Sequence, residues 1–531
     1  MSDSDTNNVK RQLGETRPMN GAQSLFKALV DAGITTCFAN PGTSEMQLVY
    51  EIGMSDKVRP VLCLQEDVVT GAADGYARMA ERPALTLLHL GPGFANGIAN
   101  LHNARRARSP VVNVIGDHAT WHAAADAPLA SDIVSLARPV SGWVRSVRSA
   151  KALARDTAEA IAAAGRAPGQ AATLIVPSDC QWDPADGPAR PLEPPAPRQV
   201  SGDAVRKCAE TLRAGARTVL LLGAMGLRER GLNAAARIAA KSGCRLFCET
   251  FPSRVERGAP LPAIERLPYF PEQALEALGA ADSIVLAGAK SPVAFFGYPN
   301  MPSSLVPEGR SVDVLAEPAD DVPAALEALA DAIGAPRAAA TAAIERPAMP
   351  TGKLDPFTAG AALAALLPEN SIVVDESATS GQPFSIASAR GPRHTYLGLT
   401  GGAIGQGLPC ATGAAVACPD RRVISFQADG SAMYTVQALW TQARESLNVT
   451  TLLCNNRSYR ILQFELARAG VTEPGRKARS MTELTNPDIE WAMLARSMGV
   501  PAVRVESADA LCTELKRALS APGPNFIEMM L

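Results

Sequence analysis

A carboxylate and a carboxamide lie 27 residues apart in the last third of the chain. Asp429 comes just after the apolar run VISFQ, Asn456 just after TTLLC, and the helical pattern TVQALWTQARES lies between them. If both runs are neighbouring strands, the two side chains share one edge of a sheet, where their oxygens suit Mg²⁺ or Ca²⁺. Gly430 and Ser431 would let backbone amides approach a phosphate group at the next helix N-terminus. Each feature alone is usually a cap or a turn, but together they predict a hard-cation site for a phosphate-bearing ligand.

The bulk composition is that of a soluble globular protein. Of the 531 residues, 47% are hydrophobic and 20% are charged, and the net charge is −2. This charge gives no electrostatic reason to expect a nucleic-acid or membrane partner. No apolar run reaches the ~20 residues that span a bilayer. The ten cysteines lack zinc-type spacing and no signal peptide is visible, so we expect reduced thiols and a cytoplasmic location.

Proline-rich segments divide the chain into three parts. DPADGPARPLEPPAP and RPAMPTGKLDP have the composition of extended linkers. Within each part, short apolar runs alternate with alanine-rich amphipathic stretches, a pattern typical of parallel strands covered by helices on both faces. The sequence therefore predicts an α/β protein of three doubly wound parallel-sheet domains. The expected organisation is a flexible tail at 1–18, domains at 19–182, 200–340 and 357–531, and linkers at 183–199 and 341–356.

Several segments resemble the thiamin-diphosphate (ThDP) enzymes of the decarboxylase and acetohydroxyacid-synthase superfamily. The stretch from Asp429 to Asn456 is similar to the family's GDG…NN motif, with Ala428 in place of the first glycine. LQEDVVTGAADGYAR, FANPGTSEMQL and GGAIGQGLPCATGAAVA also match, and the likeness covers residues 19–531. It implies pyrimidine-binding (PYR), middle and diphosphate-binding (PP) domains in chain order. It also implies that Asp429, Asn456 and the carbonyl of Ser458 bind the Mg²⁺ that holds ThDP.

The same resemblance assigns a glutamate and a set of cofactor contacts. Glu66 stands ahead of ADGYAR at the family's spacing, so it is expected to bond the aminopyrimidine ring of ThDP and promote loss of the thiazolium C2 proton. An acid at this point could otherwise serve only the first turn of a helix. Ile404 is expected to hold the cofactor in its bent form, and Gly402 to bond the ring through its carbonyl. Further expected cofactor contacts are Ala378, Thr379, Gly430, Ser431 and Tyr434.

His89 ends the apolar run ALTLL before the turn GPG, and carbonyl chemistry needs a proton donor near the intermediate. A strand-end histidine is usually structural, but His89 coincides with a substrate-facing histidine of benzoylformate decarboxylase. NPGTSE resembles that enzyme's NPGSNE, which places Thr43 where a serine binds the substrate carboxylate. The second catalytic histidine of that enzyme has no counterpart, and AKSPVAFFGYP offers Phe296 and Tyr298 instead. His102 is expected on a helix, either at its surface or in packing, and loop-like stretches are expected to hold His118, His122 and His394.

The expected function is ThDP- and Mg²⁺-dependent decarboxylation or carboligation of a 2-oxo acid through a cofactor-bound carbanion or enamine, as in benzoylformate decarboxylase. Acetolactate synthase is the competing relative, because GPGFANGIANL is similar to its pattern, although its C-terminal extension is missing here. A 2-hydroxyacyl-CoA lyase, with the arginines of NARRARS near a CoA phosphate, and a non-catalytic binding or regulatory subunit stay open.

The expected partners follow from the same resemblance. GAMGLRERG is a poor dinucleotide fingerprint, so FAD is not expected in the middle domain. The substrate is expected to be a small 2-oxo acid. The family's geometry implies a homodimer at minimum, with Glu66 and Asp429 contributed by different subunits, and a homotetramer is the expected assembly.

Overall fold

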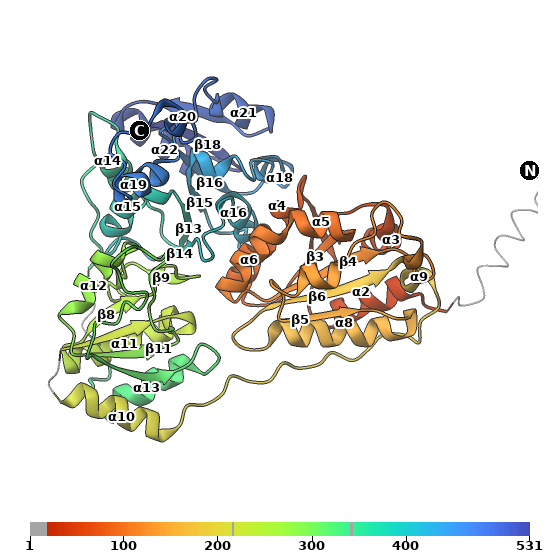
Figure 1. The fold of residues 1–531 in the computed structure, drawn as a ribbon, viewed down its shortest axis with the longest axis horizontal. Coiled ribbons are helices and arrows are strands. Elements are labelled where there is room, and N and C mark those ends of the chain that lie inside the picture. Colours follow the sequence, from red (N-terminus) through yellow and green to blue (C-terminus); the bar gives the residue numbers. More distant parts are fainter. Residues whose placement is uncertain (1–17, 215–216, 340–342) are drawn as a thin grey trace, which may run out of the picture.

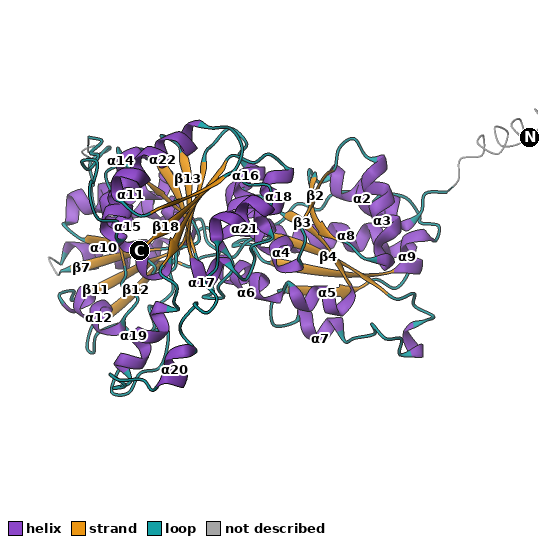
Figure 2. Ribbon diagram, turned by 90° about the horizontal axis from the view of Figure 1, so that it is seen from above, coloured by secondary structure: helices purple, strands orange, loops and turns teal. Residues whose placement is uncertain are grey.

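The computed structural model describes residues 18–214, 217–339 and 343–531, and nearly all of the tail expected at 1–18 lies outside this range. The described residues form three parallel-rich sheets, each lying between layers of helices (Figures 1 and 2). The three sheets follow one another along the chain, which confirms the predicted α/β fold. In Figure 1 the first domain lies at the right, the other two are stacked at the left, and the connecting segment runs along the lower edge.

The first sheet has the strand order β2-β1-β3-β4-β6-β5, and its neighbouring strands are parallel. Its strands are β1 (Thr36–Asn40), β2 (Arg59–Leu62), β3 (Ala84–His89), β4 (Val111–Asp117), β5 (Trp143–Ser146) and β6 (Ala171–Pro177). One face packs against α2 (Gly21–Asp31), α3 (Met46–Met54), α8 (Ala150–Gly165) and α9 (Ser178–Trp182). The other face packs against α4 (Glu66–Ala80), α5 (Leu90–Asn96), α6 (Ile98–Ala107) and α7 (Ile133–Ala137).

The middle sheet has the order β10-β8-β7-β11-β12 and is also parallel. Its strands are β7 (Thr218–Leu222), β8 (Arg245–Cys248), β10 (Glu265–Arg266), β11 (Ser283–Ala287) and β12 (Ser311–Ala316). Along β7, Leu220 and Leu222 face one buried cluster while Val219 and Leu221 face the other. Continuous apolar strands are therefore buried on both sides, as expected for a doubly wound sheet. The covering helices are α10 (Gly202–Arg213), α11 (Glu229–Ser242) and α13 (Val322–Ala332) on one face and α12 (Pro271–Gly279) on the other.

The third sheet has the order β17-β18-β16-β15-β13-β14-β9. Its strands are β13 (Ser371–Glu376), β14 (His394–Gly398), β15 (Val423–Ala428), β16 (Val449–Asn455), β17 (Ala502–Val505) and β18 (Asn525–Met530), with β9 (Val255–Arg257) at one edge. One face is covered by α14 (Pro356–Leu366), α15 (Gln382–Ala387) and α22 (Ala508–Ser520). The other face is covered by α16 (Gly407–Ala417), α18 (Ala438–Arg444) and α21 (Trp491–Ser497). Three further helices follow strand ends: α17 (Asp429–Ala432), α19 (Arg460–Arg468) and α20 (Arg476–Ser480). Strand β9 runs antiparallel to β14 although it comes from the middle segment of the chain. This edge pairing is not visible in the sequence.

Helices α4 and α16 join the first and third domains. A Cβ on Gly75 would lie 2.0 Å from the carbonyl oxygen of Cys410, so only glycine allows the two helices to approach this closely. Next to Gly75 on α4, the buried Asp74 forms an ion pair at 2.5 Å with Arg78, one turn further along the helix. Arg78 also donates to the carbonyls of Ser253 and Gly398, so one guanidinium links all three domains.

Candidate functional site

Asp429 lies at the carboxyl end of β15, beside the end of β16. The two strands are paired with Ala428 opposite Cys454, so Asp429 is next to the turn that begins at Asn455. Asp429 is 1% exposed; its Oδ1 accepts the N–H of Gly430 at 2.8 Å and its Oδ2 that of Arg457 at 2.7 Å. Burial raises the pKa of Asp429, and the backbone N–H groups oppose this rise. The carboxylate is therefore held in one orientation by the backbone.

The paired asparagines have different surroundings. Asn456 Oδ1 accepts hydrogen bonds from the N–H of Ser458 at 2.9 Å and from its hydroxyl at 3.1 Å. Asn455 points into the core, where its Nδ2 donates to Glu528 at 2.7 Å, and Glu528 is itself 1% exposed. Asn455 therefore fixes the turn, and Ser458 holds the amide oxygen of Asn456, whose backbone lies beside Asp429.

The donor set at this strand end fits Mg²⁺. A carboxylate, an amide oxygen and a backbone carbonyl are hard oxygen donors, and they leave the rest of an octahedral shell to phosphate oxygens and water. The described residues contain no group of three or more His, Cys, Asp or Glu side chains that could hold a metal. A site with a single carboxylate, such as the one expected at Asp429, does not require such a group.

The residues expected to contact a diphosphate lie along the same edge of the sheet. Ala378 and Thr379 lie in a 3₁₀ turn that begins one residue after β13, and Gly430 and Ser431 lie in α17, which begins at Asp429 directly after β15. These segments meet, because the Ser431 hydroxyl lies 3.4 Å from the carbonyl oxygen of the last β13 residue. Tyr434, the remaining expected contact, is 55% exposed just beyond α17.

The loop between β14 and α16 carries Gly402 and Ile404. Gly402 has φ +77°, and a Cβ added to it would lie 2.5 Å from the ring of Phe295. Glycine is therefore required both by the backbone conformation and by the aromatic ring packed against it. Within the described residues no hydrogen bond uses the Gly402 carbonyl. A carbonyl without a partner, beside the half-buried Ile404, fits the expected contact with the amino group of a flat ring.

Glu66 begins α4, but it does not cap the helix. The side chain of Gln65 does so, accepting the N–H groups of Asp67 at 2.6 Å and Val68 at 3.0 Å. The Glu66 carboxylate faces α5 instead, where its Oε2 accepts a hydrogen bond from Asn96 Nδ2 at 3.1 Å. Glu66 thus lies in the first turn of α4, where the helix dipole favours an acid, and its carboxylate also contacts α5.

His89 ends β3 and is held by a buried acid. Its Nδ1 lies 2.9 and 3.2 Å from the two carboxylate oxygens of Glu45 and 3.1 Å from the hydroxyl of Ser44. Glu45 is 0% exposed and also accepts the N–H of Gly42 at 2.7 Å. A proton on Nδ1 shared with Glu45 leaves Nε2 as the nitrogen available to a ligand. Thr43, the expected carboxylate-binding residue, is exposed beside Ser44 in the same turn.

Glu66 and His89 meet across one glycine. A Cβ on Gly93 would lie 3.3 Å from Glu66 Oε1 and 3.4 Å from the Cβ of His89. The structure thus places the Glu66 carboxylate and the Cβ of His89 beside the same glycine at the carboxyl edge of the first sheet, while the imidazole ring lies against Glu45 and Ser44.

Backbone strain marks the ends of three strands at these sites. Leu90, Ala378 and Arg457 have φ between 51° and 55°, although none is glycine. Left-handed backbone at such residues is uncommon and tends to occur at functional sites. Each of the three directly follows, or lies one residue from, a residue expected to act in catalysis or cofactor binding. Nothing in the residue types at these positions predicted this conformation.

One of the remaining histidines was wrongly placed by the sequence. His102 lies on α6 as expected, and it packs rather than facing solvent freely, because its Nε2 lies 3.1 Å from the carbonyl oxygen of Gly401 in the third domain. His394 is not in a loop but in β14, where it is 2% exposed. Burial and nearby arginines lower the pKa of His394 to about 3, so it stays neutral. His118 and His122 pack against each other in a loop, with ring centroids 5.5 Å apart.

The aromatic residues expected in the substrate region, Phe296 and Tyr298, differ in their contacts. The hydroxyl of Tyr298 donates to Glu465 at 3.0 Å, and the guanidinium of Arg468 lies 4.4 Å from its ring centroid, so Tyr298 holds α19. Phe296 is 53% exposed and packs edge-on against Phe295. The aromatic residue that contacts the Gly402 loop is thus Phe295, which sequence reasoning did not single out.

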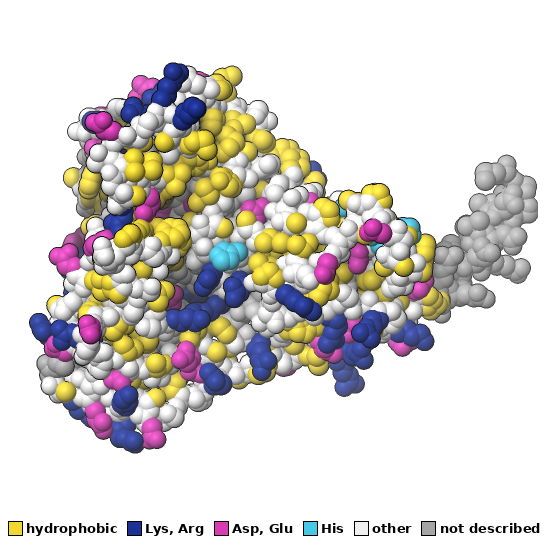
Figure 3. All heavy atoms as spheres, in the orientation of Figure 1, with side chains coloured by type: hydrophobic (Ala, Val, Ile, Leu, Met, Phe, Trp, Pro, Cys, Tyr) yellow, Lys and Arg dark blue, Asp and Glu magenta, His cyan; other side chains and the backbone are white. Residues whose placement is uncertain are grey.

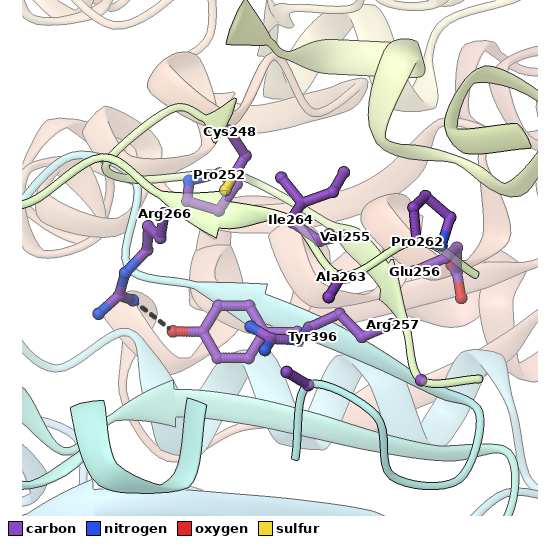
Figure 4. A pocket seen from close by; sticks show the side chains of 12 residues that line it. Cys248, Pro252, Val255, Glu256, Arg257, Pro262, Ala263, Ile264, Arg266 and Tyr396 are labelled. Atoms are coloured by element: carbon purple, nitrogen blue, oxygen red, sulfur yellow. Dashed lines mark hydrogen bonds between the residues drawn. The ribbon is translucent and has the colours of Figure 1, made fainter. Parts of the chain in front are cut away.

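Two further surface features lie apart from these residues. A cavity of about 10 Å³ between β9 and β14, lined by Arg257, Arg266 and Tyr396, has room for about one water molecule (Figure 4).

Lys and Arg side chains gather in the hollow where the first and middle domains face each other (Figure 3). Arg105 and Arg106 of α6 are exposed, and neither forms an ion pair within the described residues. Arg105 and Arg106 are therefore available to an anionic group, whereas Arg108 of the same stretch is half-buried near Glu249.

Comparison with protein-family models identifies both ends of the chain. Residues 19–136 match the model "Thiamine pyrophosphate enzyme, N-terminal TPP binding domain". Residues 380–529 match "Thiamine pyrophosphate enzyme, C-terminal TPP binding domain". The first range contains Glu66 and His89, and the second contains Gly402, Asp429 and Asn456.

In the described residues, no helix has both the length and the hydropathy needed to cross a membrane.

Curated proteins and solved structures agree with these models. The chain is 50% identical to the Mycobacterium tuberculosis protein named "Putative acetolactate synthase large subunit IlvX", over 97% of this chain and 99% of that one. It is 30% identical to the benzoylformate decarboxylase of Pseudomonas aeruginosa, over 95% of this chain and 97% of that one. Among solved structures, the thiamine diphosphate-dependent 4-hydroxybenzoylformate decarboxylase of Rhodococcus jostii superimposes with a TM-score of 0.84 at 27% identity, covering 96% of this chain and 99% of that one.

Proposed function

We propose a function from an established premise: the chain belongs to the thiamine pyrophosphate enzyme family and is a ThDP-dependent enzyme related to acetolactate synthase and benzoylformate decarboxylase. The proposed reaction is decarboxylation of a 2-oxo acid with an apolar or aromatic substituent, with ligation to a second carbonyl compound as the alternative outcome. The observation that supports it is the meeting of Glu66 and His89 across Gly93.

The strand ends of the PP domain would hold the cofactor. Asp429, Asn456 and the carbonyl of Ser458 would bind Mg²⁺, and the turn at Thr379 and the start of α17 would bind the diphosphate. When bound, ThDP supplies a nucleophilic carbon and an electron sink for cleaving the bond next to a carbonyl group. The orientation of the substrate and the movement of protons are left to side chains of this chain.

Glu66 is proposed to hold the proton that the aminopyrimidine ring needs. Asn96 engages Oε2, so Oε1 is the oxygen that remains for a ring nitrogen. His89 is proposed to donate a proton from Nε2 to the oxygen of the substrate carbonyl as that group is attacked, and to take it back when the carbonyl forms again, because Glu45 holds Nδ1. Thr43 would bind the carboxylate of the substrate.

The surroundings of Gly402 favour an apolar substituent on the substrate. Phe295 lies against this glycine, and Phe296 packs on Phe295. Helix α19, which is tied to the same segment through Tyr298, carries Leu462 and Phe464 with 46% and 43% of their surfaces exposed. Exposed apolar side chains grouped at a cofactor site are typical of substrate pockets.

We propose that the active site forms between two copies of the chain. The Glu66 side chain faces α5, whereas the Gly402 loop of the same chain rests on α6 through His102 and Asn103. Within the described residues no hydrogen bond joins Glu66 or His89 to the PP domain. A homodimer, assembled further into a homotetramer, would place the Glu66 edge of one copy on the Asp429 edge of the other.

Mixing two inactive variants tests this arrangement. In a mixture of Glu66→Gln and Asp429→Ala chains, a hybrid dimer has one site with both residues intact if they come from different chains. Activity should then appear on mixing, although each variant alone is inactive. No recovery, with hybrid dimers confirmed by native mass spectrometry, would place both residues of a site in one chain.

A substrate screen tests the reaction. Purified protein with ThDP and Mg²⁺ should be offered benzoylformate, branched 2-oxo acids, pyruvate and a 2-hydroxyacyl-CoA, and both CO₂ release and C–C products should be measured. We expect benzoylformate to be turned over faster than pyruvate. Turnover of the acyl-CoA alone would instead support the lyase alternative, with Arg105 and Arg106 near the CoA phosphates. No turnover of any substrate by ThDP-loaded protein would favour a non-catalytic role.

Acetolactate synthesis is the second candidate, because the 50% identical relative carries that name. Rapid acetolactate formation from pyruvate, undiminished in His89→Ala, would support it. FAD is not expected to be required, and this is tested by adding FAD to the same assay.

A further inference from the structure

We infer that Glu376 is a positioning residue that fixes the glycine-rich loop 401–407 in the form that receives the aminopyrimidine ring of ThDP. Glu376 is the last residue of β13 and is 4% exposed. Its Oε1 accepts the N–H groups of Gly405 at 2.8 Å and Gln406 at 3.1 Å, and its Oε2 accepts that of Gly407 at 2.7 Å. One carboxylate thus binds three consecutive backbone amides.

The loop needs such an anchor because its sequence does not fix its shape. GGAIGQG contains four glycines, and Gly402 and Gly405 have φ of +77° and +100°. Glycine-rich backbone has many accessible conformations, so an external contact must select one. The helix that follows does not supply it: the N-cap of α16 is Gln406, whose side chain donates to Asp74 rather than capping the helix.

The opposite side of the loop is held through its carbonyls. His102 Nε2 lies 3.1 Å from the carbonyl oxygen of Gly401, Asn103 Nδ2 donates to that of Ala403 at 2.7 Å, and Thr435 Oγ1 donates to that of Gly405 at 2.7 Å. Glu376 thus binds the backbone N–H groups of the loop on one side, and His102, Asn103 and Thr435 bind every second carbonyl of the loop on the other. Gly402 and Ile404, the two residues expected to contact the ring, lie between the anchored positions.

Glu376 also connects this loop to the diphosphate side of the site. Its own backbone leads into the strained turn at Ala378, and its carbonyl oxygen lies 3.4 Å from the hydroxyl of Ser431. Burial raises the pKa of Glu376 to about 7, and the three amides oppose this rise. A buried carboxylate with this set of donors costs free energy to maintain, which a simple apolar contact would avoid.

The test separates binding of the ring from binding of the diphosphate. Glu376→Gln keeps the size of the side chain but replaces one acceptor oxygen by a donor, which opposes a backbone N–H. We expect ThDP affinity, measured by calorimetry with Mg²⁺, to fall about 10- to 100-fold, in line with the loss of one or two hydrogen bonds to a charged group. The affinity for inorganic diphosphate with Mg²⁺ should stay within about twofold. Glu369→Gln, the same change at an exposed glutamate before β13, is the matched control.

A second variant approaches the loop from its other side. Thr435→Val removes the hydroxyl that bonds the Gly405 carbonyl and keeps the shape of the side chain. It should reproduce the selective loss of ThDP affinity, even if Glu376→Gln fails to fold. Hydrogen exchange in a peptide covering 401–407 should be faster in both variants.

The outcomes distinguish this inference from the cofactor assignment on which it rests. If wild-type protein does not bind ThDP, the cofactor assignment fails. If wild type binds ThDP and both variants bind it equally well, the role of Glu376 is refuted. Equal losses for ThDP and inorganic diphosphate would also refute it, because they would indicate a general structural role.

Discussion

The carboxyl edge of the third sheet and that of the first hold their functional groups in different ways. Asp429 is buried, and both of its carboxylate oxygens are bound by backbone N–H groups. Glu66 and His89 are partly exposed, and they are held by the side chains of Asn96 and Glu45. A group bound by backbone amides cannot turn unless its loop moves, whereas a group held by a side chain can change rotamer and protonation state.

This difference matches the two tasks of the site. A cofactor that stays bound through many turnovers needs a fixed anchor, which is the role proposed for Asp429 on the third sheet. Proton transfer needs groups that gain and lose a proton without disturbing the fold, which is the role proposed for Glu66 and His89 on the first sheet. Variants at the first edge should therefore affect the rate of chemistry, and variants at the third edge should affect occupancy by the cofactor.

The largest effect is expected at Glu66. Glu66→Gln should bind ThDP and Mg²⁺ normally but slow exchange of the cofactor C2 proton by about 10²–10⁴-fold, because a general acid–base group is lost. Exchange is followed by NMR after acid quenching. Asp56→Asn, at an exposed acid of the same domain, should have no effect. A Glu66→Gln protein that exchanges at the wild-type rate would remove this residue from the mechanism.

Asp429→Ala should lower the fraction of the protein that has ThDP bound. We expect more than about a 100-fold loss of ThDP affinity, since even residues outside the metal shell commonly change metal affinity by 10–100-fold. Wild-type protein treated with a chelator should show the same loss, and added Mg²⁺ should restore binding only in the wild type. Calorimetry of Asp420→Ala, an exposed aspartate before β15, serves as the control. Unchanged affinity in Asp429→Ala would overturn the metal assignment.

Glu45→Gln tests whether His89 is oriented by its buried partner. The amide can still meet Nδ1, but it no longer favours a proton there, so the wrong tautomer becomes accessible. We expect kcat to fall about tenfold, within the lower range for a misplaced general acid, while ThDP affinity is unchanged. His89→Ala should lower kcat further, and His122→Ala should not lower it. A Glu45→Gln enzyme that loses ThDP affinity instead would show that the first edge also serves as an anchor.

The smallest effect concerns pH and His394 in the third sheet. The native pKa of about 3 lies below the usual value of 6.5, so below pH 6.5 the unfolded chain binds a proton that the native chain does not. This difference lowers stability as the pH falls from 6.5 toward 3. His394→Gln should therefore lose a few degrees less than the wild type in unfolding temperature between pH 7 and pH 5. Equal losses in both proteins, measured by scanning calorimetry, would argue against a neutral buried histidine.

The sequence predicted those parts of the site that depend on strand ends. Asp429 and Asn456 could be paired before any coordinates, because parallel strands bring their carboxyl ends to one edge. Glu45 lies in the NPGTSE motif but received no role, since its contact with His89 depends on how β1 and β3 are placed in the sheet. Glu376 lies at a strand end but received no role, because no spacing connects it to loop 401–407, 25 or more residues further along the chain. Such contacts are decided by packing rather than by local pattern.

Strand β9 has a consequence for dissecting the molecule. It comes from the middle of the chain yet forms the outer strand of the third sheet, antiparallel to β14. Excising residues 200–340 would expose the N–H and C=O groups of β14 along an open edge, and such edges recruit strands from other chains. A shortened protein joining the two cofactor-binding parts should therefore aggregate unless a substitute edge strand is built in. A chimaera in which residues 200–340 are replaced by the middle domain of a relative would likewise need a strand that pairs with β14.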